Sequence, residues 1–301
     1  MKNSIVAGIV VFHPNMARLE ECLEAVQSFV EKIYIYSNSE DFSLPREMDK
    51  IVVIGEGRNM GIGHALNEIF SAADADGYDW VVTLDQDSIM PVGIISDYEQ
   101  HLSEEIGILC PQVIDKRREY MNTSSKEGIT ELEDTITSAS CTSIAAWKTI
   151  GKFDEWLFID LVDNEFCKRL VVNNFKILRL NRWILDQEFG NIESKSKLVT
   201  KFWLTVGRLL HSTNVAKLSY KKHVDLQRVY YTNRNIIYVN RKLSKYGPVG
   251  YQNYHCQSYL GFIFCFMLPS ILRSDSFLGA TNATVRGIKD GLQAKVTEVG
   301  R

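Results

Sequence analysis

Two carboxylates separated by one residue follow a short apolar run near position 85. Residues 81–84 read as a buried strand, and Asp85, Gln86 and Asp87 come directly after it. In an extended segment alternate side chains share a face, so we expect Asp85 and Asp87 to project together and Gln86 to point the other way. A hard cation such as Mg²⁺ or Mn²⁺ binds such carboxylates and links them to substrate phosphates. The alternative is that both acids are solvated at a strand end or cap the next turn.

A glycine-containing turn lies upstream of these acids. The segment NMGIGHALN at 59–67 places Gly61 and Gly63 just before a predicted helix, where backbone amides and the helix N-terminus attract an anion. Position 66 is Leu66, so the third glycine of the dinucleotide-binding fingerprint is absent, and a nicotinamide or flavin site is disfavoured. A plain strand-to-helix turn explains the segment equally well.

A second group of acids lies near the predicted start of a later helix. It consists of Asp154, Glu155, Asp160, Asp163 and Glu165. Carboxylates complement the dipole of a helix N-terminus, and on side-chain chemistry alone this capping role is favoured. A base that removes a proton from a hydroxyl would also be a carboxylate in such a place.

Two hydrophobic periodicities alternate through the first ninety residues and predict the elements that position these groups. Continuous apolar or β-branched runs at 5–12, 33–36, 51–54 and 81–84 predict strands, and helical spacing recurs in the segments around 19–30 and 65–72. This alternation predicts an α/β fold, with a mostly parallel sheet flanked by helices. Ligands bind outside the carboxyl ends of the strands of such sheets, which is where Asp85 and Asp87 fall.

Composition and cysteine usage indicate an ordinary globular chain. With 301 residues and 45% hydrophobic content, it can form one large core with a smaller attached region. Six cysteines lie scattered without a CxxC pair or metal-ligand spacing, which favours inert, buried thiols in a reducing compartment. The apolar start runs into His13 and Pro14, so we expect a first strand and not a signal peptide, and a cytoplasmic location.

Charge divides the chain into an acidic part, 1–194, and a basic part, 195–301. Between Lys195 and Lys245 twelve Lys or Arg face one acid, Asp225, whereas residues 1–194 hold seventeen basic and thirty-three acidic residues. The basic part suits a membrane surface or nucleic acid, and a solvated helical face is the simpler alternative for any single residue.

An apolar run at 259–272 favours the membrane over nucleic acid. Its fourteen residues are fewer than the roughly 20 that span a bilayer as a helix, so we expect it to lie on an anionic membrane face. The alternatives are a buried core helix or a helix that contacts a partner subunit in a homo-oligomer.

Together the segments resemble the family 2 inverting glycosyltransferases of the GT-A fold, most closely their bacterial rhamnosyltransferase branch. The resemblance rests on the order of IVVFHP (9–14), NMGIGHALN (59–67), LDQDS (84–88), GKFDEWLFIDLVDNEFCKRL (151–170) and RVYYTNRN (228–235). It spans roughly residues 4–240. It implies a Rossmann-like catalytic domain at 1–194, which binds a nucleotide sugar, and a mainly helical region at 195–301, which associates with the membrane and the acceptor.

The resemblance also implies roles for individual residues. Asp87, with Asp85 beside it, would hold Mg²⁺ or Mn²⁺ and the diphosphate of the nucleotide sugar. Asp163 would be the general base, with Asp160 and Glu165 as acidic neighbours on the acceptor side. The remaining residues assigned to the donor are Ser37, Asn38, Asn59, Gly61, Asn67, Gln86 and Arg234, of which Arg234 would reach the diphosphate or the acceptor.

This chain departs from the family pattern at two strand ends. Ser37 stands where relatives carry an Asp that binds the pyrimidine base, which leaves the nucleotide preference open. The segment DQEFG at 186–190 stands where relatives often carry a His, so the dependence on metal can differ.

The reaction implied is a single in-line displacement that inverts the anomeric carbon. Asp163, acting as an ordinary ionised carboxylate, would take the proton of the acceptor hydroxyl. The resemblance implies dTDP-L-rhamnose as donor and a lipid-linked glycan of a bacterial surface polysaccharide, such as O antigen or capsule, as acceptor. A UDP-linked sugar is the nearest alternative. A metal-dependent nucleotidyltransferase would need a phosphate-binding loop that HPNMARLEE (13–21) lacks, and a catalytically silent membrane scaffold would bind no nucleotide.

Overall fold

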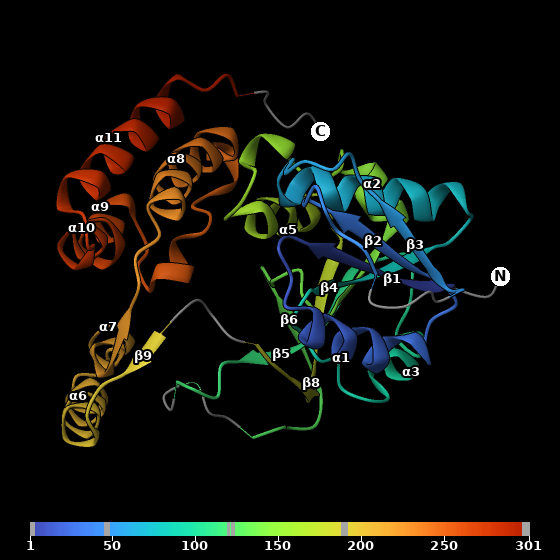
Figure 1. Ribbon diagram of the computed structural model, residues 1–301, viewed down its shortest axis with the longest axis horizontal. Helices are drawn as coiled ribbons and strands as arrows, with labels where there is room; N and C mark the ends of the chain where they lie inside the picture. The colour runs from blue at the N-terminus through green and yellow to red at the C-terminus, as the bar shows by residue number, and fades with distance from the viewer. Residues whose placement is uncertain (1–3, 45–48, 119–120, 122–123, 188–191, 297–301) are drawn as a thin grey trace. The chain divides into compact units, whose positions relative to one another are not determined.

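The computed structural model describes residues 4–44, 49–118, 121, 124–187 and 192–296. The chain divides into two compact units, of which unit 1 comprises residues 1–114 and 123–187 and unit 2 comprises residues 115–122 and 188–301. In Figure 1 the elements of unit 1 run from blue to yellow-green, and the long helices of unit 2 are yellow to red.

Unit 1 is built on an eight-stranded sheet with the order β3-β2-β1-β4-β7-β5-β8-β6. The strands are β1 (Ile5–Val11), β2 (Ile33–Ser37), β3 (Ile51–Ile54), β4 (Trp80–Asp85), β5 (Ile106–Ile114), β6 (Ile129–Leu132), β7 (Ser140–Ser143) and β8 (Lys176–Asp186). The pairs β3-β2, β2-β1, β1-β4 and β5-β8 are parallel, which confirms the predicted mostly parallel sheet. Strand β7 is antiparallel to both β4 and β5, and β6 is antiparallel to β8; the sequence did not resolve these two strands.

Helices cover both faces of this sheet. They are α1 (Met16–Gln27), α2 (Ile62–Ala75), α3 (Ile94–Glu99), α4 (Ile144–Thr149) and α5 (Val162–Val172). Helix α1 begins at Met16, three residues before the predicted spacing at 19–30, because the Asn15 side chain accepts a hydrogen bond from the Arg18 N–H, at 3.2 Å. In Figure 1, α1 and α3 lie on one side of the strands and α2 and α5 on the other.

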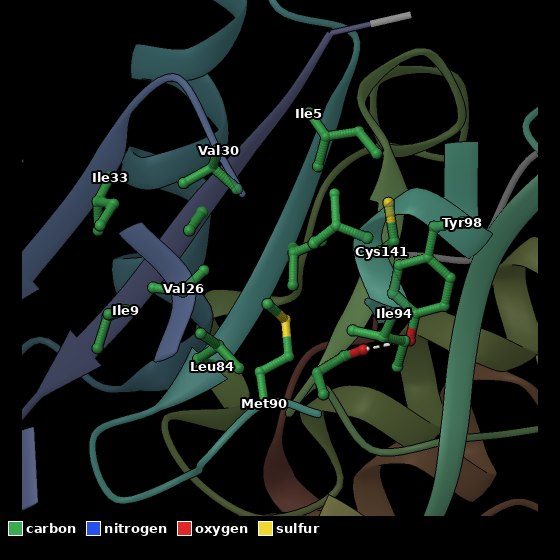
Figure 2. Packing of buried hydrophobic residues seen from close by; sticks show 14 of the residues in the cluster. Ile5, Ile9, Val26, Val30, Ile33, Leu84, Met90, Ile94, Tyr98 and Cys141 are labelled. Atoms are coloured by element: carbon green, nitrogen blue, oxygen red, sulfur yellow. Dashed lines mark hydrogen bonds between the residues drawn. The ribbon is translucent and has the colours of Figure 1, made fainter. Parts of the chain in front are cut away.

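Alternate residues of each strand fill the core beneath α1 and α3. In Figure 2, Val26 of α1 lies near Ile9 and Ile33 of the strands, while Ile94 and Tyr98 of α3 lie beside Cys141 of β7. The Tyr98 hydroxyl, fully buried, donates to the backbone oxygen of Ala139 at 2.7 Å, so its polar end is satisfied. The six cysteines are unpaired; four of them are buried as expected, whereas Cys256 and Cys265 are partly exposed. Burial raises the pKa of Cys110 to about 11, which keeps that thiol protonated at neutral pH.

The topology of the sheet places a ligand edge at β1 and β4. Strand β1 lies between β2 and β4, and the chain passes from β1 to β2 on one side and returns to β4 on the other. The connections that follow the carboxyl ends of β1 and β4 therefore lead to opposite sides. Such a switch point leaves a crevice at the strand ends in open α/β sheets. The residues that follow β1, β2 and β4 are therefore the ones to consider as ligand contacts.

Unit 2 is mainly helical, as predicted. Its elements are β9 (Ile192–Ser194), α6 (Lys197–Leu209), α7 (Thr213–Ala216), β10 (Tyr220–Lys222), α8 (Leu226–Lys242), α9 (Tyr259–Phe262), a π-helical turn (Ile263–Met267), α10 (Leu268–Arg273) and α11 (Phe277–Gln293), with short 3-10 turns at Lys217–Ser219, Ser244–Tyr246 and Tyr251–Tyr254. Helices α8 and α11 lie side by side (Figure 1) because Ala280, Thr284, Gly287 and Gly291, on one side of α11, are small enough for close contact.

One helical segment of the described residues, Tyr251–Arg273, is long and apolar enough to cross a membrane. At 23 residues it is longer than the run 259–272, because uncharged polar residues extend it toward the N-terminus. Core helices of soluble proteins reach the same length and composition, so the segment by itself assigns no location.

Candidate functional site at the carboxyl ends of β1, β2 and β4

The extended segment that was expected to carry Asp85 and Asp87 ends at Asp85. Strand β4 ends at Asp85, and the Ser88 N–H donates to the Asp85 backbone oxygen at 3.1 Å, which closes a turn through Gln86 and Asp87. The alternation of side chains therefore stops at Asp85. The sequence predicted the strand correctly but extended its geometry two residues too far.

The carboxylate of Asp85 accepts a hydrogen bond from the residue that follows β8. Gln187, the residue after β8, donates a hydrogen bond from Nε2 to Asp85 Oδ2. The Asp85 N–H donates to the Ser138 hydroxyl at 3.2 Å, which holds the strand end in place. Gln187 falls in the segment where the family often carries a His, and its Oε1 atom is buried without a partner among the described residues. Residues 188–190 of that segment lie outside the described residues.

Asp87 presents an exposed carboxylate at the same edge. The Arg18 guanidinium Nε donates to the backbone oxygen of Asp87 at 2.9 Å, which fixes the turn and leaves the Asp87 side chain in solvent. No cluster of three or more His, Cys, Asp or Glu able to hold a metal occurs in the described parts of the chain. Two acids at a strand end still fit a Mg²⁺ or Mn²⁺ that takes its remaining oxygens from water and substrate phosphates.

Gln86 has a structural role at the end of β1. Its Oε1 accepts from the Phe12 N–H at 2.8 Å and its Nε2 donates to the Phe12 backbone oxygen at 3.3 Å. Both ends of the amide are thus engaged one residue beyond β1, where they extend the pairing of β1 with β4. Its contact with the donor stays a prediction.

A cavity of about 550 Å³ opens beside the ends of β1 and β2. Its lining includes Phe12, His13, Met16, Asn38, Ser39, Phe42, Arg58 and Asn59. Asn38 and Ser39 line it and Ser37 does not, because the Ser37 hydroxyl donates to the Ser39 backbone oxygen at 2.9 Å. The contact of Ser37 with a base stays a prediction, and Asn38 and Ser39 are the residues of this strand end that line the cavity.

Asn38 and Asn59 join the cavity to the glycine-containing turn. Asn38 is buried, and its Oδ1 accepts from the Met60 N–H at 2.9 Å, which leaves its NH₂ group as the donor at the cavity wall. Asn59 is exposed and its Oδ1 accepts from the Gly61 N–H at 3.0 Å. Both side chains lie where the sequence placed them, in the stretch lining the pocket, and their contacts with a donor stay a prediction.

Gly61 is required by the backbone and by its neighbour. Its φ is +86°, and a Cβ atom there would lie 2.7 Å from the backbone oxygen of Phe158. The next residue, Ile62, donates its N–H to that same oxygen at 2.6 Å. The turn before α2 is therefore fitted against the segment that leads to α5, and any side chain at position 61 would separate them.

Asn67 does not line the pocket as predicted. It is 4% exposed, and its Oδ1 accepts from Trp147 Nε1 at 3.1 Å and from the Phe153 N–H at 2.9 Å. Its Nδ2 donates to the Phe153 oxygen at 3.0 Å and to Glu155 Oε1 at 2.8 Å. All four hydrogen-bonding positions of the amide are filled by protein. Asn67 therefore clamps the segment before α5 to α2.

Sequence patterns did not identify Glu155 as the partner that completes this contact between α2 and the segment before α5. Glu155 accepts from Asn67 and lies 2.9 Å from His64 Nδ1, so it joins two residues one turn apart on α2. The sequence contained a signal for the burial of Asn67. This residue lies four positions after Gly63 and one position after Leu66, and those two residues form the buried side of α2 together with Phe70.

Asp163 lies in the first turn of α5 and carries a shifted pKa. Burial raises the pKa of Asp163 to about 7; the Asn164 N–H, 2.9 Å from Asp163 Oδ1, opposes the shift, and the charges of Asp134 and Asp160 add to it. Asp134 is held here by Asn164, whose Nδ2 donates to Asp134 Oδ2 at 2.8 Å. The expectation of an ordinary ionised carboxylate is corrected: at neutral pH Asp163 is divided between its two protonation states. Asp134 is a neighbour that sequence reasoning missed, since about thirty positions separate it from α5.

The backbone before α5 is bent into a rarely used conformation. Phe158, Asp160 and Leu161 have φ values of 61°, 64° and 64°, in the left-handed region that non-glycine residues seldom adopt. Asp160 is partly buried here, next to the acids that surround Asp163, in agreement with its predicted neighbourhood. Strain of this kind persists only where the surrounding structure holds it, as the Phe158 oxygen and the Glu155 clamp do here.

Glu165 has a structural role, and its predicted place on the acceptor side stays a prediction. It is fully buried, and its two oxygens each accept from the Arg169 guanidinium at 2.7 Å. Arg169 also donates to the backbone oxygens of Ile150 and Lys152, both at 2.6 Å. The i, i+4 spacing of an acid and an arginine on one helix is the signal that could have identified this ion pair from the sequence.

Arg234, the last residue assigned to the donor, belongs to α8 of unit 2. It is 8% exposed, its Nε donates to Asn235 Oδ1 at 2.9 Å, and its guanidinium lies 4.6 Å from the ring centre of Tyr231. These contacts make it a packed residue of its helix. Its predicted contact with the diphosphate or acceptor stays a prediction.

Comparison with solved structures identifies the class of this fold. The mannosyltransferase PcManGT from Pyrobaculum calidifontis, solved with GDP-Man and Mn²⁺, superimposes with a TM-score of 0.51 at 8% identity, over 98% of this chain and 77% of that one. GalNAc-T7, solved with UDP, GalNAc and Mn²⁺, superimposes with a TM-score of 0.50 at 10% identity, over 87% of this chain and 56% of that one. The chain has the GT-A fold of glycosyltransferases, as predicted.

Sequence comparison adds a relative with a named sugar. The dTDP-rhamnosyl transferase RfbF of Shigella flexneri is 26% identical over 197 residues, which cover 59% of this chain and 66% of that protein. The match thus spans just under two thirds of the relative's length. No family model matches the chain. The predicted resemblance to GT-A glycosyltransferases, with a rhamnosyltransferase among the relatives, is confirmed.

Proposed function

We propose that this chain is a metal-dependent inverting glycosyltransferase whose donor is dTDP-L-rhamnose and whose acceptor is a lipid-linked glycan of a bacterial surface polysaccharide. The GT-A fold and the two glycosyltransferase structures support the reaction class. Similarity to a dTDP-rhamnosyl transferase supports the donor. The O-antigen or capsule context and the acceptor rest on the resemblance of the motifs alone.

The observation that carries the proposal is the carboxyl of Asp163 in the first turn of α5. Asp163 accepts the proton of an acceptor hydroxyl while that oxygen forms a bond to the anomeric carbon and the bond from that carbon to the diphosphate breaks. Attack from the side opposite the leaving group inverts the configuration. Because burial raises the pKa of Asp163 to about 7, the carboxylate is a stronger base than an exposed Asp, and a useful fraction is still ionised at neutral pH.

The donor is proposed to lie along the carboxyl ends of β1, β2 and β4. The cavity beside Asn38 and Asn59 is large enough for a nucleoside, and the exposed ring of Phe12 offers a surface for a base to stack on. Asp87, with Asp85, would hold the metal ion that serves the diphosphate. A bound Mg²⁺ or Mn²⁺ offsets the charge that builds on the leaving diphosphate.

Attachment to the inner face of the cytoplasmic membrane is part of the proposal, because a lipid-linked acceptor is presented there. Within Tyr251–Arg273, four large apolar side chains recur every fourth residue and are 40–73% exposed: Leu260, Phe264, Leu268 and Leu272. Residues 251–272 contain no Asp, Glu, Lys or Arg. Such a segment gains by contact with lipid.

The donor can be tested by thermal unfolding of the full chain with nucleotide sugars, with and without Mn²⁺. A ligand that binds the native state alone raises its stability, so dTDP-rhamnose with Mn²⁺ should raise the melting temperature more than UDP-glucose or GDP-mannose does. A larger effect of a UDP sugar would reassign the donor. Release of pyrophosphate from nucleoside triphosphates would indicate a nucleotidyltransferase, and no response to any nucleotide would contradict the proposal.

A further inference from the structure

Helix α6 of unit 2 has a sharply divided surface. It is 13 residues long, Lys197–Leu209, and three rows of side chains run along it with the same spacing of four and then seven residues. The first row is Lys197, Lys201 and Arg208, the second is Leu198, Phe202 and Leu209, and the third is Val199, Trp203 and Leu210. Since eleven residues make about three turns, each row lies on one side of the helix, and neighbouring rows are adjacent.

The second row, which is apolar, faces solvent instead of the protein core. Leu198 is 83% exposed, Phe202 is 58% exposed and Leu209 is 73% exposed. The three cationic residues of the first row are exposed as well. An apolar stripe of this length costs free energy in water, and single scattered residues do not account for it.

The opposite side of α6 holds it to unit 2. A Cβ atom at Gly207 would lie 2.8 Å from the Ala216 backbone nitrogen, and the Thr200 hydroxyl donates to the Ser219 oxygen at 3.1 Å. Gly207 lies nine residues after Leu198, about two and a half turns, so it faces away from the apolar stripe. Figure 1 shows α6 beside α7, on which it packs. The stripe is therefore left uncovered by the helix's own partners.

Charge distinguishes the occupants that could cover this stripe. Residues 195–224 hold seven Lys or Arg and no Asp or Glu. In a symmetric dimer through α6, the cationic row of one copy would meet that of the other, which disfavours a second copy. Nucleic acid would pair with the cations but gain little from exposed Leu198 and Leu209. An anionic bilayer satisfies both rows, because apolar side chains enter the acyl boundary and cations lie at the phosphates.

We propose that α6 is an interfacial docking helix, which lies in the plane of an anionic membrane with Leu198, Phe202 and Leu209 inserted and Lys197, Lys201 and Arg208 at the headgroups. The helix is about 20 Å long, too short to cross a hydrocarbon core of about 30 Å, so it lies on the surface. This contact is separate from the Tyr251–Arg273 segment. It deepens the proposed membrane attachment by naming an anchoring element.

Sedimentation of the full chain with vesicles tests the proposal. We expect binding to vesicles of equal parts phosphatidylcholine and phosphatidylglycerol, weaker binding in high salt, and little binding to phosphatidylcholine alone. The double change Lys197→Gln, Lys201→Gln should weaken binding about 30-fold, since each basic residue near an anionic surface contributes about fivefold. Leu198→Asp with Leu209→Asp should weaken binding to the vesicles that contain phosphatidylglycerol at least tenfold.

A matched control is Val92→Asp, which changes a 73% exposed apolar residue of unit 1 and should leave vesicle binding unchanged. Binding of the α6 variants equal to that of the unchanged chain would overturn the proposal. So would loss of binding only on Phe264→Asp, or a dimer that ignores vesicles and dissociates on Leu198→Asp. The shift in melting temperature with dTDP-rhamnose, measured on the same samples, reports the donor site separately, so failure of one proposal does not imply failure of the other.

Discussion

Replacement of Asn67 by Ala separates the role that the fold gives this residue from the role that its motif implies. The resemblance places Asn59 and Asn67 together against the donor, whereas in the structure Asn59 is exposed beside the cavity and Asn67 is buried. Asn67→Ala removes the partner of three buried groups: the Phe153 N–H, the Phe153 oxygen and Trp147 Nε1. A buried polar group left unpaired costs about 1–3 kcal/mol, and partial relaxation around the smaller side chain brings the expected total to about 3–5 kcal/mol.

The assay is thermal unfolding with and without donor, on matched variants. For a chain of 301 residues a loss of about 4 kcal/mol corresponds to a fall of about 6 °C in melting temperature, since the unfolding entropy is about 2.1 cal/mol/K per residue. Asn59→Ala removes one hydrogen bond in an exposed turn and should shift the melting temperature by about 2 °C or less, while reducing the stabilisation by dTDP-rhamnose. An Asn67→Ala chain that melts like the unchanged chain but no longer responds to donor would refute the clamp and restore the motif's assignment.

Three further substitutions test the site. Asp163→Asn should abolish transfer and keep donor binding. The folded pKa of Asp163, about 7, lies above the unfolded value of about 3.9, so ionisation of Asp163 lowers the stability of the native state as pH rises between these values. The variant should therefore gain most in melting temperature at pH 8 and little at pH 4. Transfer by the unchanged chain should rise with pH through about 7, and a flat profile would remove Asp163 from the base role. Asp87→Ala should weaken metal-dependent donor binding about tenfold or more, measured by titration with and without Mn²⁺, and equal affinities would exclude Asp87 from the metal site. Glu165→Ala should lower stability by about 3–5 kcal/mol in chemical unfolding, because it leaves the Arg169 charge buried without its partner, and a change below about 1 kcal/mol would contradict the structural role.

Local sequence patterns predicted the parts of the fold that local physics determines. Continuous apolar runs predicted β1, β2, β3 and β4 within a residue or two. For β1, β2 and β4 the reason is that a strand buried on both faces must be apolar throughout, and for the edge strand β3 it is the β-branched run at 51–54. Strand β7, Ser140–Ser143, was not resolved, because its four residues are small and polar and its place between β4 and β5 depends on partners far along the chain.

The site shows the same division between local and distant information. Asp87 and Asp163 lie in motifs that follow one another in a recognisable order, and this order can be read directly from the sequence. What separates Asn67 from Asn59 is burial against Trp147, eighty positions away, which no short motif encodes. Gln187 contacts Asp85 across 102 positions and was equally out of reach, whereas the pair of Glu165 and Arg169 lies within one helical turn and was available from spacing alone.

The left-handed residues before α5 set a limit on how far this protein can be stabilised without loss of function. Phe158, Asp160 and Leu161 each hold a backbone conformation that costs about 1 kcal/mol for an L-residue, and glycine at any of them would relieve that cost. The same relief would widen the range of positions open to the Asp163 carboxyl. Selection for heat resistance should therefore favour glycine within residues 158–161, whereas selection for turnover should keep the residues that are there now.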